Sequence, residues 1–190
     1  MLPAFRLSRT FAAARLQQEL DALVAEEFVP HFNTQCYTGD WSAVPLRSVG
    51  GRPRHIYPDP AARVPFADAP LLGHCPYVRE VLAYFQCPQQ SVRFLRLKPG
   101  AVIKPHTDLA LSFEEGEARL HIPVRTNPDV RFVLDGRRIV MAEGECWYSD
   151  FTLVHSVENQ GTTDRVHLVV DCLVNDWLRE LFAAETARAA

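Results

Sequence analysis

The chain has few cysteines, and their arrangement excludes one class of small protein. Only 5 of its 190 residues are cysteine, and they are scattered without a CxxC pair. A disulfide-stabilised secreted domain usually carries an even, regularly spaced set. We therefore expect reduced thiols and a cytoplasmic location. The cysteines stand at positions 36, 75, 87, 146 and 172.

The chain also lacks a strong excess of one charge and a long apolar run. It has 20 Lys and Arg against 23 Asp and Glu, a net charge of −3, and the two signs are well mixed. No basic stripe offers a surface to nucleic acid or to an anionic membrane. No apolar run approaches the roughly 20 residues that span a bilayer, and the first residues lack the pattern of a signal peptide. We expect a soluble protein without a nucleic-acid or membrane partner, and leave its oligomeric state open.

What is present indicates one globular domain with helices around a β-rich part. A composition of 47% hydrophobic and 23% charged residues is ordinary for a soluble domain of this size. Apolar residues at helical spacing predict helices over 9–28 and 78–85. A third is expected over 175–182, with Asn175 or Asp176 as its N-cap. Residues 31–70 are rich in proline and turn formers, so we expect short strands and a functional cover there.

The second half of the chain is typical of a jelly roll. Its short segments are rich in β-branched and aromatic residues, and the Asp-Gly pair at 135–136 predicts a hairpin. We expect a mainly β fold with flanking helices, a single domain over 1–190. It would consist of N-terminal helices and a loop-rich cover over 1–88, a jelly-roll core over 89–175 and a C-terminal helix over 176–190. The predicted strands are 91–97, 101–108, 118–124, 130–134, 137–141, 145–149 and 165–174.

Three residues in this part form a candidate metal site. His106 and Asp108 are two apart in a predicted strand, so both side chains would project from the same face. His155 follows a later strand and can supply a third ligand if the sheets fold back. Two imidazoles and one carboxylate form the facial triad of non-haem iron(II) oxygenases. An HxD pair followed by a histidine also arises by chance, and the same ligands could hold zinc.

Two further strands carry cationic residues that would suit a dicarboxylate such as 2-oxoglutarate. Arg165 stands ten residues after His155, at the start of the last predicted strand. A guanidinium binds a carboxylate through two parallel hydrogen bonds. Arg119 and His121 share one face of their strand. The competing interpretation is that Arg165 is a surface residue and that Arg119 and His121 form the solvated face of an edge strand.

Other classes of protein fit the sequence less well. A zinc hydrolase with the HExxH motif is disfavoured because that spacing is absent, and no G-x-S-x-G elbow occurs. A cupin-like module that holds a metal or a small acid without turnover stays open as the alternative. Arg165 and the Arg119–His121 pair argue against it, because a simple metal sensor has no need of a dicarboxylate anchor.

Taken together, these motifs resemble the aspartyl/asparaginyl β-hydroxylase family of Fe(II)- and 2-oxoglutarate-dependent dioxygenases. The family includes the bacterial cis-proline hydroxylases. The resemblance covers roughly residues 91–178 and rests on four segments in particular. They are "RFLRLKPGAVIKPHTD", "RLHIPV", "GECWYSDFTLVHSVENQGTTDRVHLVVD" and "NDWL".

The resemblance implies a double-stranded β-helix and an oxidoreductase that hydroxylates a C–H bond of an amino-acid side chain. The substrate would be either Asp or Asn in a peptide or protein, or a free amino acid. The implied cofactors are Fe(II), 2-oxoglutarate as cosubstrate and O2, and succinate and CO2 would be released. The animal aspartyl hydroxylase has glycine where this chain has Asp108. The complete triad is therefore more similar to the amino-acid hydroxylase branch.

The resemblance also implies a role for each candidate residue. By position the iron ligands would be His106, Asp108 and His155. Arg165 would anchor the distal carboxylate of 2-oxoglutarate, and His121 would contact its carboxylate next to the iron. Arg119 would face either the cosubstrate or an acidic group of the prime substrate.

Five more residues are given weaker expectations. Trp147 is expected to pack in the core, and Asp150 to bond backbone amides or a group that positions His155. Arg47, Arg93 and Arg96 are candidates for binding a substrate carboxylate. Arg93 and Arg96 fall on opposite faces of their strand, so at most one of them points inward.

Overall fold

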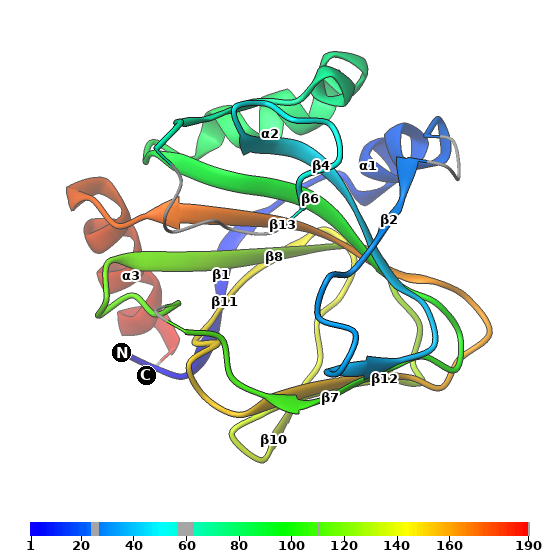
Figure 1. The fold of residues 1–190 in the computed structure, drawn as a ribbon. Helices are drawn as coiled ribbons and strands as arrows, with labels where there is room; N and C mark the ends of the chain where they lie inside the picture. The colour runs from blue at the N-terminus through cyan, green and yellow to red at the C-terminus, as the bar shows by residue number, and fades with distance from the viewer. Residues whose placement is uncertain (24–26, 57–62, 110, 190) are drawn as a thin grey trace.

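Two antiparallel β-sheets face each other, and helices cover the outer side of the larger one (Figure 1). The computed structural model describes residues 1–23, 27–56, 63–109 and 111–189. The larger sheet runs in the order β1 (Ala4–Thr10), β11 (Glu145–Ser149), β8 (Glu117–Arg125), β13 (Arg165–Leu173), β6 (Gln89–Leu97), β4 (Trp41–Val49) and β2 (Val29–Pro30), with β5 (Phe66–Asp68) paired to β4. The smaller sheet runs β10 (Arg137–Ile139), β9 (Val130–Leu134), β12 (His155–Asn159), β7 (Val102–His106) and β3 (Tyr37–Thr38).

The helices lie outside this pair of sheets. They are α1 (Ala13–Asp21), the short 3-10 helix η2 (Pro70–His74), α2 (Pro76–Tyr84) and α3 (Asp176–Ala189). The predicted mainly β jelly roll with flanking helices is thus confirmed. Within the described residues, no helix is both long enough and apolar enough to cross a bilayer.

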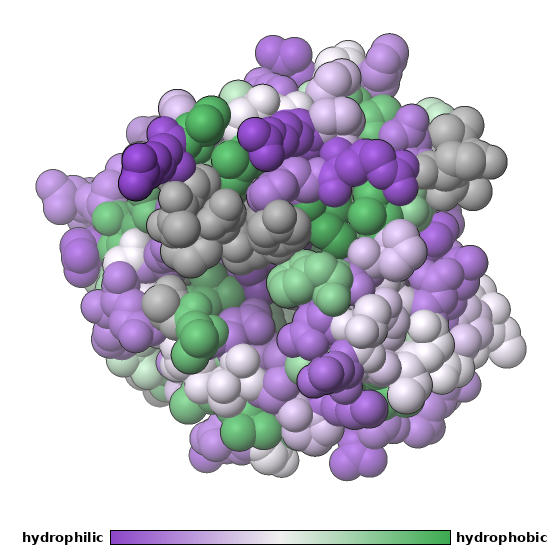
Figure 2. Space-filling view, viewed as in Figure 1, coloured by the Kyte–Doolittle hydropathy of each residue, from purple (hydrophilic) through white to green (hydrophobic). Residues whose placement is uncertain are grey.

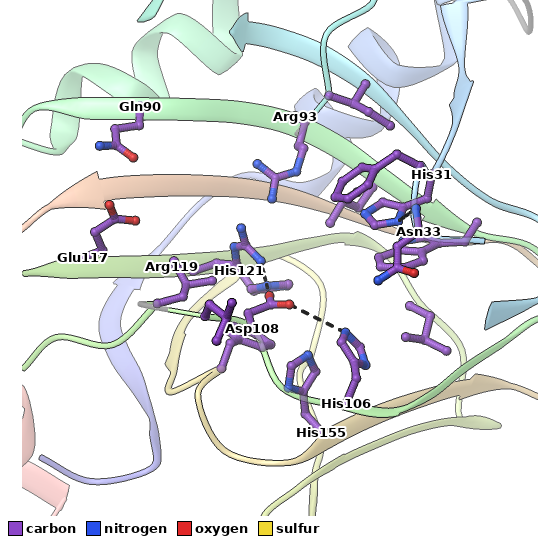
Figure 3. A pocket seen from close by; sticks show the side chains of 18 of the residues that line it. His31, Asn33, Gln90, Arg93, His106, Asp108, Glu117, Arg119, His121 and His155 are labelled. Atoms are coloured by element: carbon purple, nitrogen blue, oxygen red, sulfur yellow. Dashed lines mark hydrogen bonds and ion pairs between the residues drawn. The ribbon is translucent and has the colours of Figure 1, made fainter. Parts of the chain in front are cut away.

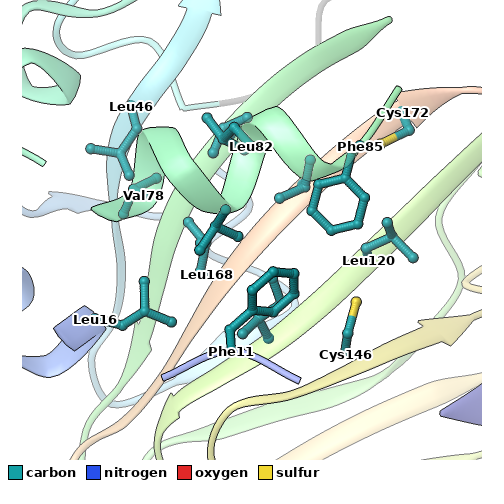
Figure 4. Packing of buried hydrophobic residues seen from close by; sticks show 14 of the residues in the cluster. Phe11, Leu16, Leu46, Val78, Leu82, Phe85, Leu120, Cys146, Leu168 and Cys172 are labelled. Carbon is teal, nitrogen blue, oxygen red and sulfur yellow. The ribbon is translucent and has the colours of Figure 1, made fainter. Parts of the chain in front are cut away.

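The central strands of the larger sheet are buried on both faces, but the two faces differ in chemistry. In β13, Val166, Leu168 and Val170 belong to a core that also contains residues of α1, α2 and α3 (Figure 4). The alternate residues, including Arg165 and His167, point to the other face, between the sheets. Because side chains alternate along a strand, one face is apolar and stabilising while the other can carry polar groups.

A second apolar cluster closes part of the space between the sheets. It contains Trp41 and Leu97 from the larger sheet and Ile103, Phe132 and Val157 from the smaller one. The Asp-Gly hairpin that joins β9 to β10 is confirmed by the register, in which Leu134 faces Arg137. Both turn residues have positive φ, 47° at Asp135 and 72° at Gly136, as a two-residue type I′ turn requires.

The helix predicted over 9–28 is wrong at its N-terminal end and too long. Residues 4–10 form β1, where Phe5 and Leu7 are buried and Arg6 and Ser8 are exposed. This alternation of period 2 pairs β1 with β11, and α1 begins only at Ala13 and ends at Asp21. The predicted strands also omit one that begins at His155. Residues 155–159 form β12, with the pattern buried, half-buried, buried, half-buried, buried, so that His155 opens a strand.

Two further predictions need adjustment. Part of the expected loop-rich cover is β4, a strand of nine residues that pairs with β6 in the larger sheet. The C-terminal helix runs to residue 189 instead of 182. Its N-cap is Asn175, whose Oδ1 accepts the backbone N–H of Leu178 at 3.0 Å. Val24, included in the predicted first helix, lies outside the described residues.

Candidate active site

A cavity of about 730 Å³ opens between the two sheets. This volume is within the range of small-molecule sites. The six residues predicted to bind the metal or the cosubstrate all line this cavity. They are His106, Asp108, His155, Arg119, His121 and Arg165.

The triad is assembled by the pairing of β7 with β12. His106 is the last residue of β7 and His155 the first of β12, and the two face each other in the register. Their ring centroids are 4.2 Å apart. Asp108 follows β7 by two residues, and its backbone N–H donates to the carbonyl of Phe151 at 2.8 Å. One potential ligand atom from each of the three residues lies within 4.8 Å of the others, so the group could hold a metal ion (Figure 3).

Backbone carbonyls determine which nitrogen of each imidazole is available. Nδ1 of His106 lies 2.8 Å from the carbonyl of Lys104, and Nδ1 of His155 lies 3.0 Å from the carbonyl of Leu153. A carbonyl only accepts, so each Nδ1 carries the proton and each Nε2 has a free lone pair. Burial lowers the pKa of His155, which favours the neutral ring that binds metals. Both histidines therefore present Nε2 as a potential ligand atom.

Asp108 is oriented by a guanidinium. Its Oδ2 accepts from Nη1 of Arg119 at 2.8 Å, while Oδ1 lies 3.7 Å from Nε2 of His106. Asp108 thus has one oxygen engaged and the other facing the two histidines. A carboxylate held in this way can bind a metal through a single oxygen.

Arg119 is held in turn by a buried carboxylate, Asp171. Nε and Nη2 of Arg119 donate to Asp171 at 2.6 and 3.0 Å, and Nη1 of Arg93 donates to it at 2.9 Å. The side chain of Asp171 is only 3% exposed. Burial alone would raise the pKa of Asp171, but the guanidiniums of Arg119 and Arg93 outweigh it and hold the pKa well below its usual value. Arg93, Asp171 and Arg119 form one ion-pair network, which ends at Asp108.

Arg165 also lines the cavity, and within the described part of the chain it forms no ion pair with a carboxylate. It is 4% exposed, and the one hydrogen bond of its side chain within the described residues is from Nη2 to Nδ1 of His167, at 3.2 Å. Nε of Arg165 and Nε2 of His121 are buried without a hydrogen-bond partner among the residues that the structure describes. Burial lowers the pKa of Arg165 to about 9, so the side chain is still protonated at neutral pH. An unpaired buried cation is costly and indicates a site for an anion.

The histidines beside Arg165 are neutral. Burial is the main cause that lowers the pKa of both His121 and His167 well below the ordinary value, and the nearby Arg165 lowers it further. Their Nδ1 atoms lie 3.1 Å apart. Among the described residues, the positive charge at this end of the cavity is therefore that of Arg165.

Comparison with known proteins agrees with this geometry. The family model for aspartyl/asparaginyl beta-hydroxylase matches residues 11–174. The chain belongs to this family. The expected resemblance is thus confirmed, and it extends further toward the N-terminus than the segments that first indicated it.

One protein is similar to this chain in sequence, and two solved structures are similar to it in fold. An L-proline cis-4-hydroxylase from Rhizobium meliloti (strain 1021) is 31% identical over 164 residues, which cover 85% of this chain and 57% of that protein. The chain thus spans little more than half the length of this curated relative. A 2OG-Fe(II) oxygenase family oxidoreductase from Burkholderia pseudomallei is 17% identical, with a TM-score of 0.59 over 90% of this chain and 86% of that one. A prolyl-4-hydroxylase from Pseudomonas putida is 13% identical, with a TM-score of 0.56 over 91% and 93%. The two structures show a shared fold.

The three arginines considered as candidates for binding a substrate carboxylate lie in different places. Arg93 points into the cavity and is 4% exposed, whereas Arg96, on the other face of β6, packs over the ring of Phe28 with 3.7 Å to its centroid. Arg47 bonds the backbone of Gln89 and is not part of the cavity wall. Of the three arginines in question, the structure brings only Arg93 to the site.

Trp147, expected to pack in the core, and Asp150, expected to bond backbone amides, have the predicted kinds of contact. Trp147 packs against the second apolar cluster and its Nε1 donates to Glu145 at 2.8 Å. Asp150 Oδ1 accepts from the backbone N–H and hydroxyl of Thr152, at 3.0 and 2.6 Å. This bond shapes the turn that leads to Leu153, whose carbonyl orients His155.

The mouth of the cavity carries apolar side chains. Phe32, Val64 and Leu109 line it, and they are 56%, 49% and 95% exposed. Deeper in, the ring of His31 stacks on Trp41 with centroids 3.4 Å apart, and burial is the main cause that lowers the pKa of His31 to about 3. The face shown in Figure 2 mixes hydrophobic and hydrophilic side chains. The mouth can therefore contact apolar parts of a ligand while its interior is charged.

Proposed function

We propose that the protein is an Fe(II)- and 2-oxoglutarate-dependent dioxygenase that hydroxylates a C–H bond of an amino acid. The observation that carries the proposal is the pairing of two features in one cavity: a His–Asp–His group with metal-ligand geometry, and the buried, unpaired cation Arg165. Zinc would fit the same three ligands, but it would leave Arg165 without a role. Family membership and the shared fold support the same function.

The chain's own residues would hold the metal at His106 Nε2, His155 Nε2 and one oxygen of Asp108. Two imidazoles and a carboxylate on one side are the donor set of non-haem iron(II) sites. When bound, iron(II) and 2-oxoglutarate activate dioxygen, so that a substrate C–H becomes C–OH while 2-oxoglutarate gives succinate and carbon dioxide. The carbonyls behind both imidazoles and Arg119 behind Asp108 keep the ligands in place.

The cosubstrate would be held at the deep end of the cavity. The unpaired Nε of Arg165 and the neighbouring Nη2 can together bind a terminal carboxylate through two parallel bonds. The buried Nε2 of His121, unpartnered among the described residues, lies on the same wall. It would donate to the second carboxylate of 2-oxoglutarate in the tautomer that becomes available once the terminal carboxylate takes Nη2 of Arg165 away from Nδ1 of His167. Phe151 packs against both His121 and His155 and excludes water between them.

A carboxylate of the prime substrate would bind at the ion-pair network. Arg93 and Arg119 carry two positive charges. Asp171 balances one of them, and the charge of Asp108, which also pairs with Arg119, would be balanced by the bound metal. In the described residues, the side-chain hydrogen bonds of Arg93 run from Nη1, to Asp171 and Ser91, and the residue lines the cavity. The network therefore offers a surplus positive charge next to the triad, which favours an amino acid with a carboxylate.

The test is turnover by the reconstituted protein. Wild-type protein with iron(II), 2-oxoglutarate and oxygen should release succinate, faster when a suitable amino acid is added, with L-proline as the first to try. Asp108→Ala should abolish the release because it removes a ligand, and the exposed Asp129→Asn should match wild type. Binding of iron and 2-oxoglutarate without any succinate would instead favour the non-catalytic cupin-like module.

A further inference from the structure

Glu117 is a charged residue of the cavity that the proposed reaction does not use. It is the first residue of β8, and residues 117, 119 and 121 project from the same face of that strand. All three line the cavity. In the register with β13, Arg119 faces Asp171, while Glu117 is one step further along the sheet, away from Arg165.

The amide side chain of Gln90 is the neighbour of Glu117 at this end of the cavity (Figure 3). Figure 3 shows the two side chains facing each other at one end of the cavity, beyond Arg119 and Arg93. Gln90 also lines the cavity. A carboxylate and an amide oxygen thus lie next to the cationic network.

Glu117 has no counter-charge of its own. Arg119, the nearest cation along the strand, donates to Asp171 and Asp108, and among the described residues Glu117 takes part in no ion pair. Burial is the main cause that raises the pKa of Glu117, and Asp171 raises it further. A half-buried carboxylate in this state is stabilised by an arriving cation.

We propose that Glu117 and Gln90 form a subsite for a protonated amine, and that the prime substrate is therefore a free α-amino or α-imino acid. The inference rests on the proposed function, because it takes the Arg93–Asp171–Arg119 network as the carboxylate subsite. In a free amino acid the amine and the carboxylate are two bonds apart, as neighbouring anionic and cationic subsites require. A residue inside a peptide has amides in both places, so its nitrogen cannot satisfy the charge of Glu117 even where an aspartyl side chain supplies a carboxylate to the network.

The expected difference in affinity between a free amino acid and its N-acylated form follows from the hydrogen bond to Glu117 that acylation removes. A hydrogen bond to a charged group contributes about 1.5–3 kcal/mol, which corresponds to roughly 10- to 100-fold in affinity. Acylation of the substrate nitrogen should weaken binding by this factor. Removal of the charge of Glu117 should weaken binding of the free amino acid by the same factor and should leave binding of the acylated form unchanged.

The experiment is anaerobic calorimetry on protein loaded with iron(II) and 2-oxoglutarate, so that binding is measured without turnover. The probes are L-proline and the other free L-amino acids, each paired with its N-acetyl derivative. Wild type should bind at least one free amino acid roughly 10- to 100-fold more tightly than its N-acetyl derivative. Glu117→Gln should bring the ratio close to one. Glu117→Asp should retain it, and the exposed helix residue Glu180→Gln should not change it.

Three results would overturn the inference: equal binding of free and acetylated forms by wild type, an equal loss of both in Glu117→Gln, or no binding of any free amino acid. The visible charge-transfer band of the iron–2-oxoglutarate chelate, recorded on the same samples, separates the two proposals. Its absence from wild type would contradict the proposed function itself. With the band present, the three results contradict only the amine subsite.

Discussion

The substitution Asp171→Asn tests whether the ion-pair network organises the site. Asp171 and asparagine have the same shape, so the change removes one negative charge without opening a cavity. It leaves Arg93 and Arg119 buried side by side, 4% and 8% exposed, with no carboxylate between them. The expected result is a large loss of stability together with a loosened Asp108.

The magnitude follows from the bonds at each oxygen. Oδ1 of an asparagine could still accept Nε of Arg119, now at 2.6 Å, but the amide nitrogen cannot accept the two bonds that reach Oδ2, at 2.9 and 3.0 Å. At about 1.5–3 kcal/mol for each bond to a charged group, the loss is about 3–6 kcal/mol. Breaking a buried ion pair costs about 3–5 kcal/mol in general, so the two figures agree.

Urea unfolding at several pH values is the assay. At pH 7 we expect the free energy of unfolding to fall by about 3–5 kcal/mol relative to wild type, and the melting temperature by about 6–20 °C. The pKa of Asp171 is lower in the folded than in the unfolded state, so its stabilisation is complete above the unfolded value of about 4 and is lost as the pH falls below it. The difference in the free energy of unfolding between variant and wild type should therefore become smaller only at acidic pH. Asp129→Asn, at an exposed carboxylate, is the control. A difference below 1 kcal/mol at pH 7 (roughly a fivefold change in the folding equilibrium) would refute the reasoning.

Two further predictions concern the cosubstrate end and the helix side of the larger sheet. Arg165→Lys keeps the charge but loses the two parallel bonds, so the apparent KM for 2-oxoglutarate should rise about 10- to 100-fold with iron affinity unchanged; an equal loss of both would argue against the anchoring role. Phe182 of α3 is fully buried and packs edge-on against Phe5, with ring centroids 5.0 Å apart. Phe182→Ala should lower the free energy of unfolding by about 3–5 kcal/mol in urea titrations while the KM for 2-oxoglutarate stays unchanged; a shifted KM would contradict the separation of the two faces.

The triad could be predicted from the sequence because two of its residues are only two positions apart and the third follows a recognisable strand. His106 and Asp108 share a face by strand geometry alone. His155 was placed opposite them although its own strand was missed. In β12 the alternating buried residues are His155, Val157 and Asn159, so only one of the three is apolar and the pattern resembles a turn. Pairing with β7 on one side and β9 on the other makes it a strand.

Asp171 and Glu117 could not be found in this way. Asp171 stands near the end of an apolar run, where a carboxylate usually marks the return to solvent. Its partners are on β6 and β8, distant in sequence, and nothing in the local spacing encodes them. One weak signal was available: Arg165, His167 and Asp171 have even separations and share one face of β13. The pattern does not reveal whether that face meets water or a cavity.

Helix α1 shows the opposite error, in which a real periodicity was extended too far. Phe11 and Leu16 fit a helical spacing, and residues 9–10 were included with them. The preceding residues alternate with period 2 and pair with β11, and this tertiary contact decided their conformation.

The most direct test of the account is the binding of the metal and cosubstrate by the intact protein. Anaerobic protein with iron(II) and 2-oxoglutarate should develop the weak visible charge-transfer band of the chelate, and Asp108→Ala should not. If the wild-type protein showed no band while remaining folded, the ligands between β7 and β12 and the cation at Arg165 would not form the site described.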